Sequence, residues 1–214
     1  MASQEAQVQG ASKAQDFGLI FDTMERAIRE VFDVSHKGVS IDKEIVKDFV
    51  IKGDKLTHVD IPTVYIKYRN IKVAVSYHTD ENKYYVATAI LGPDGYLKFD
   101  IKVSDSDLRT ALAKFKEKAS KSFIAYANWL LRYSRLIANS ATESKDFIAT
   151  IAAMITIGPY FVHIVENMED VLFVTGSLSA RRKLKAILKD IYEVDDELLK
   201  LRDSLWPGQG LTIP

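Results

Sequence analysis

The chain has 214 residues, 47% of them hydrophobic and 27% charged, and its 29 lysines and arginines balance its 29 aspartates and glutamates. This length suits one domain with an appendage or two small domains, and the zero net charge gives no sign of a polyanionic partner. The absence of cysteine excludes disulfides, thiolate catalysis and cysteine-ligated metals, so we predict a cytoplasmic protein. Few methionines beside many lysines and isoleucines also favour a thermophile.

The first 15 residues are small and polar and lack the regions of a signal peptide, so we predict a disordered tail. An amphipathic helix is predicted over residues 17–32, with Asp16 as its N-cap, and a loop to about Gly38 follows. The apolar positions of this helix are Leu19, Ile20, Met24, Ala27, Ile28 and Val31.

Residues 46–103 alternate between apolar and polar side chains, with turn signals at residues 53–54, 69–70, 79–82 and 92–95. This pattern predicts an antiparallel β-meander, and with the flanking helices it indicates an α+β fold. The first strand is ambiguous, because Ile41, Ile45 and Phe49 also fit a helix.

The turns fix the expected register of the hairpins. The expected pairs are Tyr68–Ile71, Ile66–Val73, Val64–Val75, Tyr77–Tyr84, Val75–Val86, Ile90–Leu97, Thr88–Phe99 and Val86–Ile101. One face of the sheet is then apolar and packs on helices, with Val64, Ile66, Ile71, Val73, Val75, Val86, Ile90, Leu97, Phe99, Ile101 and Val103. Tyr68, Tyr77 and Tyr84 fall on this core face as well.

The opposite face combines aromatic, basic and small side chains. It carries Tyr65, Lys67, Lys72, Tyr85, Tyr96, Lys98 and Lys102 around a floor of Ala74, Ser76, Ala87 and Ala89. Asp100 is the only acid expected there. Two interpretations stay open, because small residues allow either a ligand or a packed helix to approach closely.

After residue 104 the pattern becomes helical. A long helix, capped by Ser104, Ser106 or Asp107, is predicted to about Asn139. Another begins at Thr142 and is broken or kinked at residues 158–159, and a third segment reaches Val174. Residues 147–165 carry no Asp, Glu, Lys or Arg, but their Gly-Pro pair and weak flanks favour buried core helices over a membrane span.

A heptad pattern marks the C-terminal region, after a linker at residues 175–177. Large aliphatic side chains follow at steps of three and four: Leu184, Ile187, Ile191, Val194, Leu198, Leu201 and Leu205. This seam predicts a coiled-coil helix, resembling a leucine zipper, that joins two chains as a homodimer. The alternative is a last bundle helix that folds back on its own chain.

Motifs for catalysis or metal binding are absent from the sequence. The four histidines do not share ligand spacing, and no phosphate-binding loop, nucleophile elbow or calcium loop occurs. We therefore predict a non-enzymatic protein without a cofactor or a metal.

Basic residues gather between residues 109 and 135, where Lys114, Lys118 and Lys121 share one helix face and Glu117 is the only acid. Single-stranded nucleic acid is bound by aromatic rings that stack on bases and by cations that follow the phosphates. The predicted site therefore consists of Tyr65, Lys67, Lys72, Tyr85, Tyr96, Lys98, Lys102, Lys114, Lys118 and Lys121.

The order of a leading helix, an antiparallel sheet, further helices and the zipper LKAILKDIYEVDDELLKLRDSL resembles the single-stranded DNA-binding proteins of the archaeal Thermoproteales, called ThermoDBP. The resemblance rests on architecture and covers most of the chain. It implies a cleft that binds single-stranded DNA without sequence preference, and a zipper that joins two protomers.

These observations divide the chain into a tail at residues 1–15, an α+β nucleic-acid-binding domain at residues 16–175 and a dimerisation helix at residues 178–206. The expected partners are single-stranded nucleic acid and a second copy of the chain, without a membrane. The alternative is a structural or assembly protein, of a virion or a scaffold, whose seam and apolar helices meet protein partners.

Overall fold

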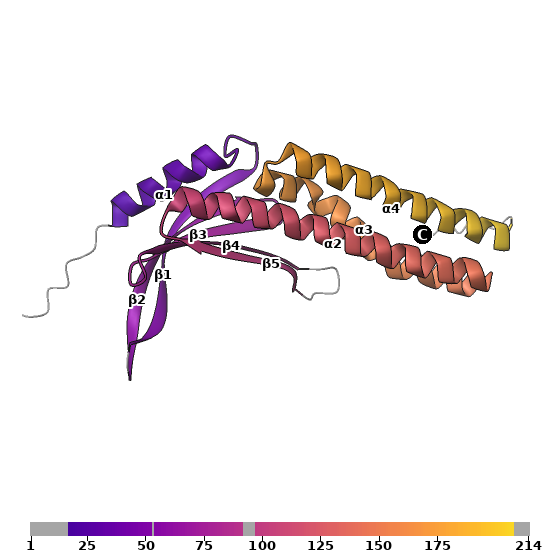
Figure 1. The fold of residues 1–214 in the computed structure, drawn as a ribbon, viewed down its shortest axis with the longest axis horizontal. Coiled ribbons are helices and arrows are strands. Elements are labelled where there is room, and N and C mark those ends of the chain that lie inside the picture. The colour runs from indigo at the N-terminus through magenta and orange to yellow at the C-terminus, as the bar shows by residue number, and fades with distance from the viewer. Residues whose placement is uncertain (1–16, 53, 92–96, 208–214) are drawn as a thin grey trace, which may run out of the picture.

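A computed structural model describes residues 17–52, 54–91 and 97–207 of the chain. The architecture is α+β, with one helix, a five-stranded antiparallel sheet and then three long helices (Figure 1). The elements are α1 (Phe17–Val31), β1 (Val39–Lys52), β2 (Lys55–Tyr68), β3 (Ile71–His78), β4 (Lys83–Leu91), β5 (Leu97–Asp105), α2 (Leu108–Ser144), α3 (Phe147–Thr175) and α4 (Leu178–Leu205). The predicted tail and the Asp16 cap lie outside the described residues.

The strands follow one another in space in the order β1-β2-β3-β4-β5, so the sheet is the meander that the sequence predicts. Pairing of Ile66 with Val73 and of Val75 with Val86 confirms the register of the two central hairpins. Each of these hairpins closes with a residue at positive φ, Arg69 at 49° and Asn82 at 52°.

The predicted register of the last hairpin is wrong by two residues. Val86 pairs with Val103 and Ile90 with Phe99, because the hairpin closes at Leu91 and Leu97 and a bulge follows at residues 90–91. The longer loop and the bulge each displace the pairing by one residue. Since side chains alternate with a period of two, a shift of two residues leaves the β5 residues beyond the bulge, such as Ile101 and Lys102, on their predicted faces.

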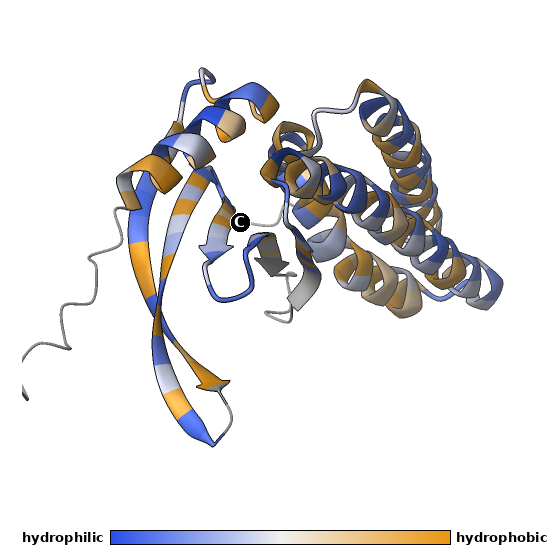
Figure 2. Ribbon diagram, turned by 60° about the vertical axis from the view of Figure 1, so that its left-hand side comes forward, coloured by the Kyte–Doolittle hydropathy of each residue, from blue (hydrophilic) through white to orange (hydrophobic). Residues whose placement is uncertain are grey.

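The first strand begins at Val39, seven residues earlier than predicted, and the helical alternative is wrong. It pairs with β2 along its whole length, from Val39–Tyr68 to Lys52–Lys55. We call the far part of this hairpin, residues 45–52 and 54–62, the arm. The arm extends from the sheet on the side away from the helices, and its outer part has apolar positions although it is exposed (Figures 1 and 2). Phe49, Ile51 and Leu56 are 60%, 77% and 68% exposed.

Helices α1 and α2 cover the apolar face of the sheet. Asp107, one of the three predicted candidates, is the N-cap of α2 and accepts a hydrogen bond from the backbone N–H of Thr110. Phe115 and Phe123 of this helix are buried with Val64, Val73 and other strand residues in one core. Tyr68 is 4% exposed, so its predicted place on the core face is confirmed.

Beyond the sheet, α2 continues as part of a bundle with α3 and α4. The predicted break at residues 158–159 is wrong, because α3 runs through Pro159 without interruption. Pro159 lies on the exposed side of the helix. There water can hydrogen-bond the carbonyl group that loses its N–H partner, which lowers the cost of an internal proline.

The predicted dimerisation helix is not confirmed. The heptad seam of α4 packs on α2 and α3 of the same chain, and Leu184, Ile191 and Leu198 are each 1% exposed. Ile187 and Val194 are also buried, while Leu201 and Leu205 are partly exposed near the helix end. Gly176, at φ 55°, caps α3 and connects it directly to α4. The structure therefore has the alternative arrangement, in which the seam closes a bundle within one chain.

The bundle is tied to the sheet through the β2–β3 turn. The backbone N–H of Asn70 donates to a carboxylate oxygen of Asp170 at 3.3 Å, and Arg69 pairs with Glu169 at 2.6 Å. Asp170 is fully buried, and its second carboxylate oxygen has no hydrogen-bond partner among the described residues. Burial raises the pKa of the Asp170 carboxyl, because the charged form loses its hydration.

The Ile191→Ala substitution tests the intramolecular seam. We expect the free energy of unfolding, measured by urea denaturation, to fall by about 2–5 kcal/mol because a buried aliphatic side chain is lost. The molar mass measured by light scattering should equal that of the wild type. A dimer that dissociates in this variant would instead show that the seam joins two chains.

The Asp170→Asn substitution tests the buried carboxylate. The amide keeps an acceptor for Asn70 and removes the charge, so we expect a gain of about 1 kcal/mol in stability at pH 7. Because the folded-state pKa of Asp170 is raised, the wild type loses stability as pH rises above the ordinary value of an aspartate. The gain should therefore disappear below about pH 4. A gain that persists at pH 3 in thermal denaturation would contradict this explanation.

Candidate nucleic-acid interface

The face of the sheet opposite α1 and α2 is uncovered in the described part of the chain. Ala74 and Ala87 are partly exposed and Ala89 is exposed, so no helix occupies the small-residue floor. This observation decides between the two interpretations of that floor in favour of an open surface. The arm extends along one side of this surface, which we call the uncovered face (Figure 1).

Two tyrosine–lysine pairs lie on either side of the floor. The Lys72 Nζ is 3.7 Å from the centroid of the Tyr65 ring, and the Lys102 Nζ is 4.9 Å from the centroid of the Tyr85 ring. Both distances fall within the range of cation–π interactions. Tyr65 and Tyr85 stand on strands that lie about 10 Å apart, with Ala74 in the strand between them, and they are offset by two residues along the strands.

Strand β1 brings acidic residues to the uncovered face that the predicted site did not include. Asp42 pairs with Tyr65 across the β1–β2 ladder, and its carboxylate forms an ion pair with the Lys67 amine at 2.6 Å. This contact raises the pKa of the Lys67 amine. Burial, followed by the charge of Glu44, raises the pKa of Tyr65. The charges of this face are therefore mixed.

A third acid lies beside Tyr85, at the β3–β4 turn. The Tyr85 hydroxyl donates to Glu81 at 2.5 Å, which raises the pKa of this tyrosine. The ring of His78 lies 4.4 Å from the Tyr85 ring, centroid to centroid. Tyr85 is thus held in place by a hydrogen bond at its hydroxyl and by two neighbours at its ring.

The three lysines of α2 do not join the uncovered face. Lys114 and Lys121 form ion pairs with Asp105 and Glu117, each at 2.5 Å. Lys118 donates to the backbone carbonyl of Lys102 at 3.1 Å and so reaches only the outer edge of β5. The structure therefore does not bring them together with the tyrosines of that face, because α2 packs on the opposite side of the sheet.

Two predicted residues are only partly accounted for. Tyr96 lies outside the described residues. The backbone of Lys98 belongs to β5, at the bulge between the Leu91–Leu97 and Ile90–Phe99 pairs, and its side chain lies outside the described part. The described members of the predicted site that share the uncovered face are Tyr65, Lys67, Lys72, Tyr85 and Lys102.

Four residues of the uncovered face were not predicted from the sequence: Asp42, Glu44, His78 and Glu81. The first two follow from the alternation of β1, which becomes visible only once the strand is extended back to Val39. A row of aromatic rings on α2, at steps of three and four, was not predicted either. Trp129 stacks on Tyr126 at 6.0 Å and on Tyr133 at 5.3 Å, with interplanar angles of 12° and 8°.

A cavity of about 470 Å³ lies at the junction of α1, α2 and α3, on the helical side of the sheet. Lys116 lines it and donates to the backbone carbonyl of Val31 at 2.9 Å, and burial lowers the pKa of this lysine. Within the ranges that the structure describes, no group of three His, Asp or Glu residues is placed to hold a metal ion.

Comparison with known proteins gives no match. No protein-family model matches the chain, and no curated protein or solved structure shows significant similarity to it. The likeness to ThermoDBP proteins therefore stays a prediction.

Among the described elements, α3 alone is long and apolar enough to cross a membrane, and 22% of its most apolar stretch is buried in the fold.

Proposed function

We propose that the chain binds single-stranded nucleic acid, DNA in particular, on the uncovered face of its sheet and without sequence preference. The observation that supports this proposal is the open floor of small residues between the Tyr65–Lys72 and Tyr85–Lys102 pairs. Small side chains let a strand approach the sheet closely. The rings offer stacking surfaces to bases, each worth roughly 1–3 kcal/mol.

Lys72 and Lys102 have a role in the free protein and another in the proposed complex. In the free protein each amine lies over a tyrosine ring. When a base stacks on that ring, the long and flexible side chain can turn outward to a phosphate at little cost. Binding therefore exchanges a cation–π contact for a stacking contact and an ion pair, and salt weakens the ion pair.

Acids on the same face limit the expected affinity. Asp42 neutralises Lys67, and Glu44 and Asp100 repel phosphates nearby. We therefore expect dissociation constants in about the micromolar range at physiological salt, weaker than those of strongly basic nucleic-acid-binding proteins.

A second candidate function, an assembly or scaffold protein, is favoured by one specific observation. Large apolar side chains are exposed on two separate elements, with Ile51 77% exposed on the arm and Ile148 76% exposed on α3. Isolated exposed apolar residues are ordinary, but clusters on projecting elements are typical of contacts with other proteins. This function needs no nucleic acid.

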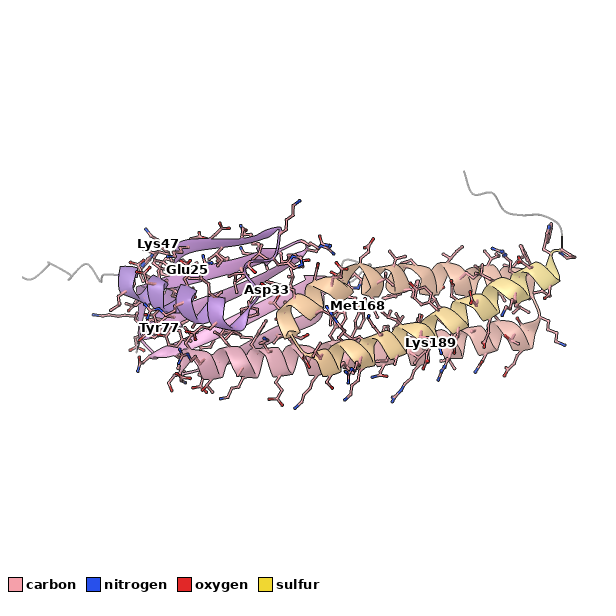
Figure 3. All side chains as sticks on the ribbon, turned by 90° about the horizontal axis from the view of Figure 1, so that it is seen from above. Glu25, Asp33, Lys47, Tyr77, Met168 and Lys189 are labelled. Atoms are coloured by element: carbon pink, nitrogen blue, oxygen red, sulfur yellow. The ribbon has the colours of Figure 1, made fainter. Side chains whose placement is uncertain are left out.

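The Lys72→Ala, Tyr85→Ala double variant tests the proposed site. We expect its affinity for a labelled single strand of about 20 nucleotides to fall at least about tenfold, because one stacking ring and one phosphate contact are lost. Fluorescence anisotropy at low and high salt measures the change. The matched control is Lys189→Ala with Tyr192→Ala, which removes the same residue types from α4 (Figure 3).

Three outcomes are informative. Equal loss in both double variants would mean that the uncovered face is not the site. Equal affinity for duplex and single strand would contradict a stacking mechanism. Absence of binding by the wild type even at low salt would overturn the proposal and favour assembly with protein partners.

The Asp42→Asn substitution tests the charge balance. It releases Lys67 from its ion pair, so we expect the affinity for the same single strand to rise a few-fold at low salt and the salt dependence to become steeper. Asp48→Asn is the control, because it makes the same change in net charge on the same strand about 20 Å away. Equal gains in both variants would indicate a general charge effect without a role for Lys67.

A further inference from the structure

The outer side of α3 carries an apolar stripe that has no partner within the described chain. Its members follow at steps of four and three: Ile148, Ala152, Ile155, Pro159 and Val162. Ile148, Ile155 and Val162 are 76%, 69% and 49% exposed. Residues 147–165 contain no Asp, Glu, Lys or Arg. The spacing is the one that two helices need to pack along a common seam.

Aromatic side chains of the neighbouring helices widen this stripe on both sides. Trp129 of α2 contacts Tyr160 of α3, and Trp206, next to the end of α4, contacts Phe147 of α3. These tryptophans are 45% and 48% exposed. In Figure 3, α3 forms one long side of the bundle, so this surface is accessible from outside. A continuous apolar surface with partly exposed aromatic residues is typical of a protein–protein interface.

We propose that this surface joins two copies of the chain, with their α3 helices packed antiparallel about a twofold axis at Ile155. In that arrangement Ile155 meets its own copy and Ile148 faces Val162 of the second copy. The small Ala152 lies opposite Pro159 to within one residue. A twofold contact of this kind pairs every position of the stripe with another member of the stripe.

Charge at the two ends of the stripe supports the antiparallel direction. Lys145 precedes the stripe and Glu166 follows it, at equal distances from Ile155 to within one residue. Both are exposed, and neither forms an ion pair within the described residues. Antiparallel packing brings each Lys145 to a Glu166, whereas parallel packing would bring like charges together.

Two other acids near the stripe, Asp146 and Glu169, already have contacts. The Asp146 carboxylate caps α3 by accepting from the backbone N–H of Ile148 at 2.7 Å, and Glu169 pairs with Arg69. Glu166 is thus the acid at the C-terminal end of the stripe that is free for the symmetric contact. The arrangement gives two equivalent ion pairs per dimer.

A second copy fits this surface better than a lipid bilayer does. Spanning a membrane would pull α3 out of the bundle and expose Ala153, Ile157 and Ile164, each at most 4% exposed. A helix that lies flat on a membrane surface typically has basic residues on both sides of its apolar stripe. Here the C-terminal end of the stripe is acidic, with Glu166 and Glu169.

Sedimentation velocity of the full chain over about 1–200 µM tests the proposal. We expect a monomer–dimer equilibrium in the wild type, and dimerisation at least about 100-fold weaker in Ile155→Glu, because two carboxylates would be buried against each other. Ile155 is 69% exposed, so this variant should keep the far-UV circular dichroism and melting behaviour of the wild-type fold. Lys185→Glu, on the exposed side of α4, is the control and should dimerise as the wild type does.

A charge exchange tests the direction of packing. Lys145→Glu should weaken the dimer about threefold to thirtyfold, and adding Glu166→Lys should restore it, because each reversed pair again joins opposite charges. A wild type that stays monomeric at every concentration, or a dimer that Ile155→Glu leaves intact, would overturn the proposal. So would Ile155-dependent binding to neutral phosphatidylcholine vesicles without self-association. Failure of the charge exchange to restore the dimer would exclude the antiparallel register.

Discussion

Helix α2 is the element on which the rest of the structure depends, because it belongs to two packing layers at once. Its 37 residues correspond to about 55 Å of continuous helix. The first part lies over β4 and β5, and the remainder forms a bundle with α3 and α4 (Figure 1). Leu112 lies in the part of α2 that packs on the sheet, and Leu130 lies in the part that belongs to the bundle. Both are fully buried and belong to one core. A single rigid helix therefore fixes the position of the bundle relative to the sheet.

This arrangement places all long helices on one side of the sheet or beyond its end. The other side is left to side chains that must remain compatible with water. The chain meets this constraint with small residues at the centre and with charged residues of both signs around them, among them Lys67 and Asp42. Basic and acidic residues are equal in number over the whole sequence, and both signs also occur together on the face that is proposed to bind a polyanion. Any binding there depends on local geometry, since the long-range field of the molecule is weak.

Much of the fold could be predicted from the sequence, because turns and alternation are local signals. The two central hairpins have short closed turns, and their register followed directly from them. The register of the last hairpin was not predicted correctly, because the alternation of residues around Ile90 and Leu91 does not reveal a bulge. The start of β1 was missed for another reason. The β1 part of the arm is largely exposed on both faces, so burial imposes no clear alternation on residues such as Ile45 and Phe49.

The helices show a different limit of sequence reasoning. A stripe with heptad spacing indicates that one side of a helix packs against other apolar residues. It does not indicate whether those residues belong to the same chain. The seam at Ile191 is covered within the chain, whereas the less regular stripe at Ile155 is exposed. For the candidate site, Tyr65 and Tyr85 were placed correctly because strand alternation determines the face. Lys114 and Lys121 were misplaced, because which side of a sheet a later helix covers depends on tertiary packing.

The lysines that lie over Tyr65 and Tyr85 have a consequence for the free protein. An open sheet with tyrosine rings and alanines at its centre is the kind of surface on which molecules stick to one another during folding or storage. Each ammonium group occupies a ring face and carries its own hydration shell there, so another apolar surface must first displace a hydrated cation. The two amines thus oppose unspecific association through this face of the sheet.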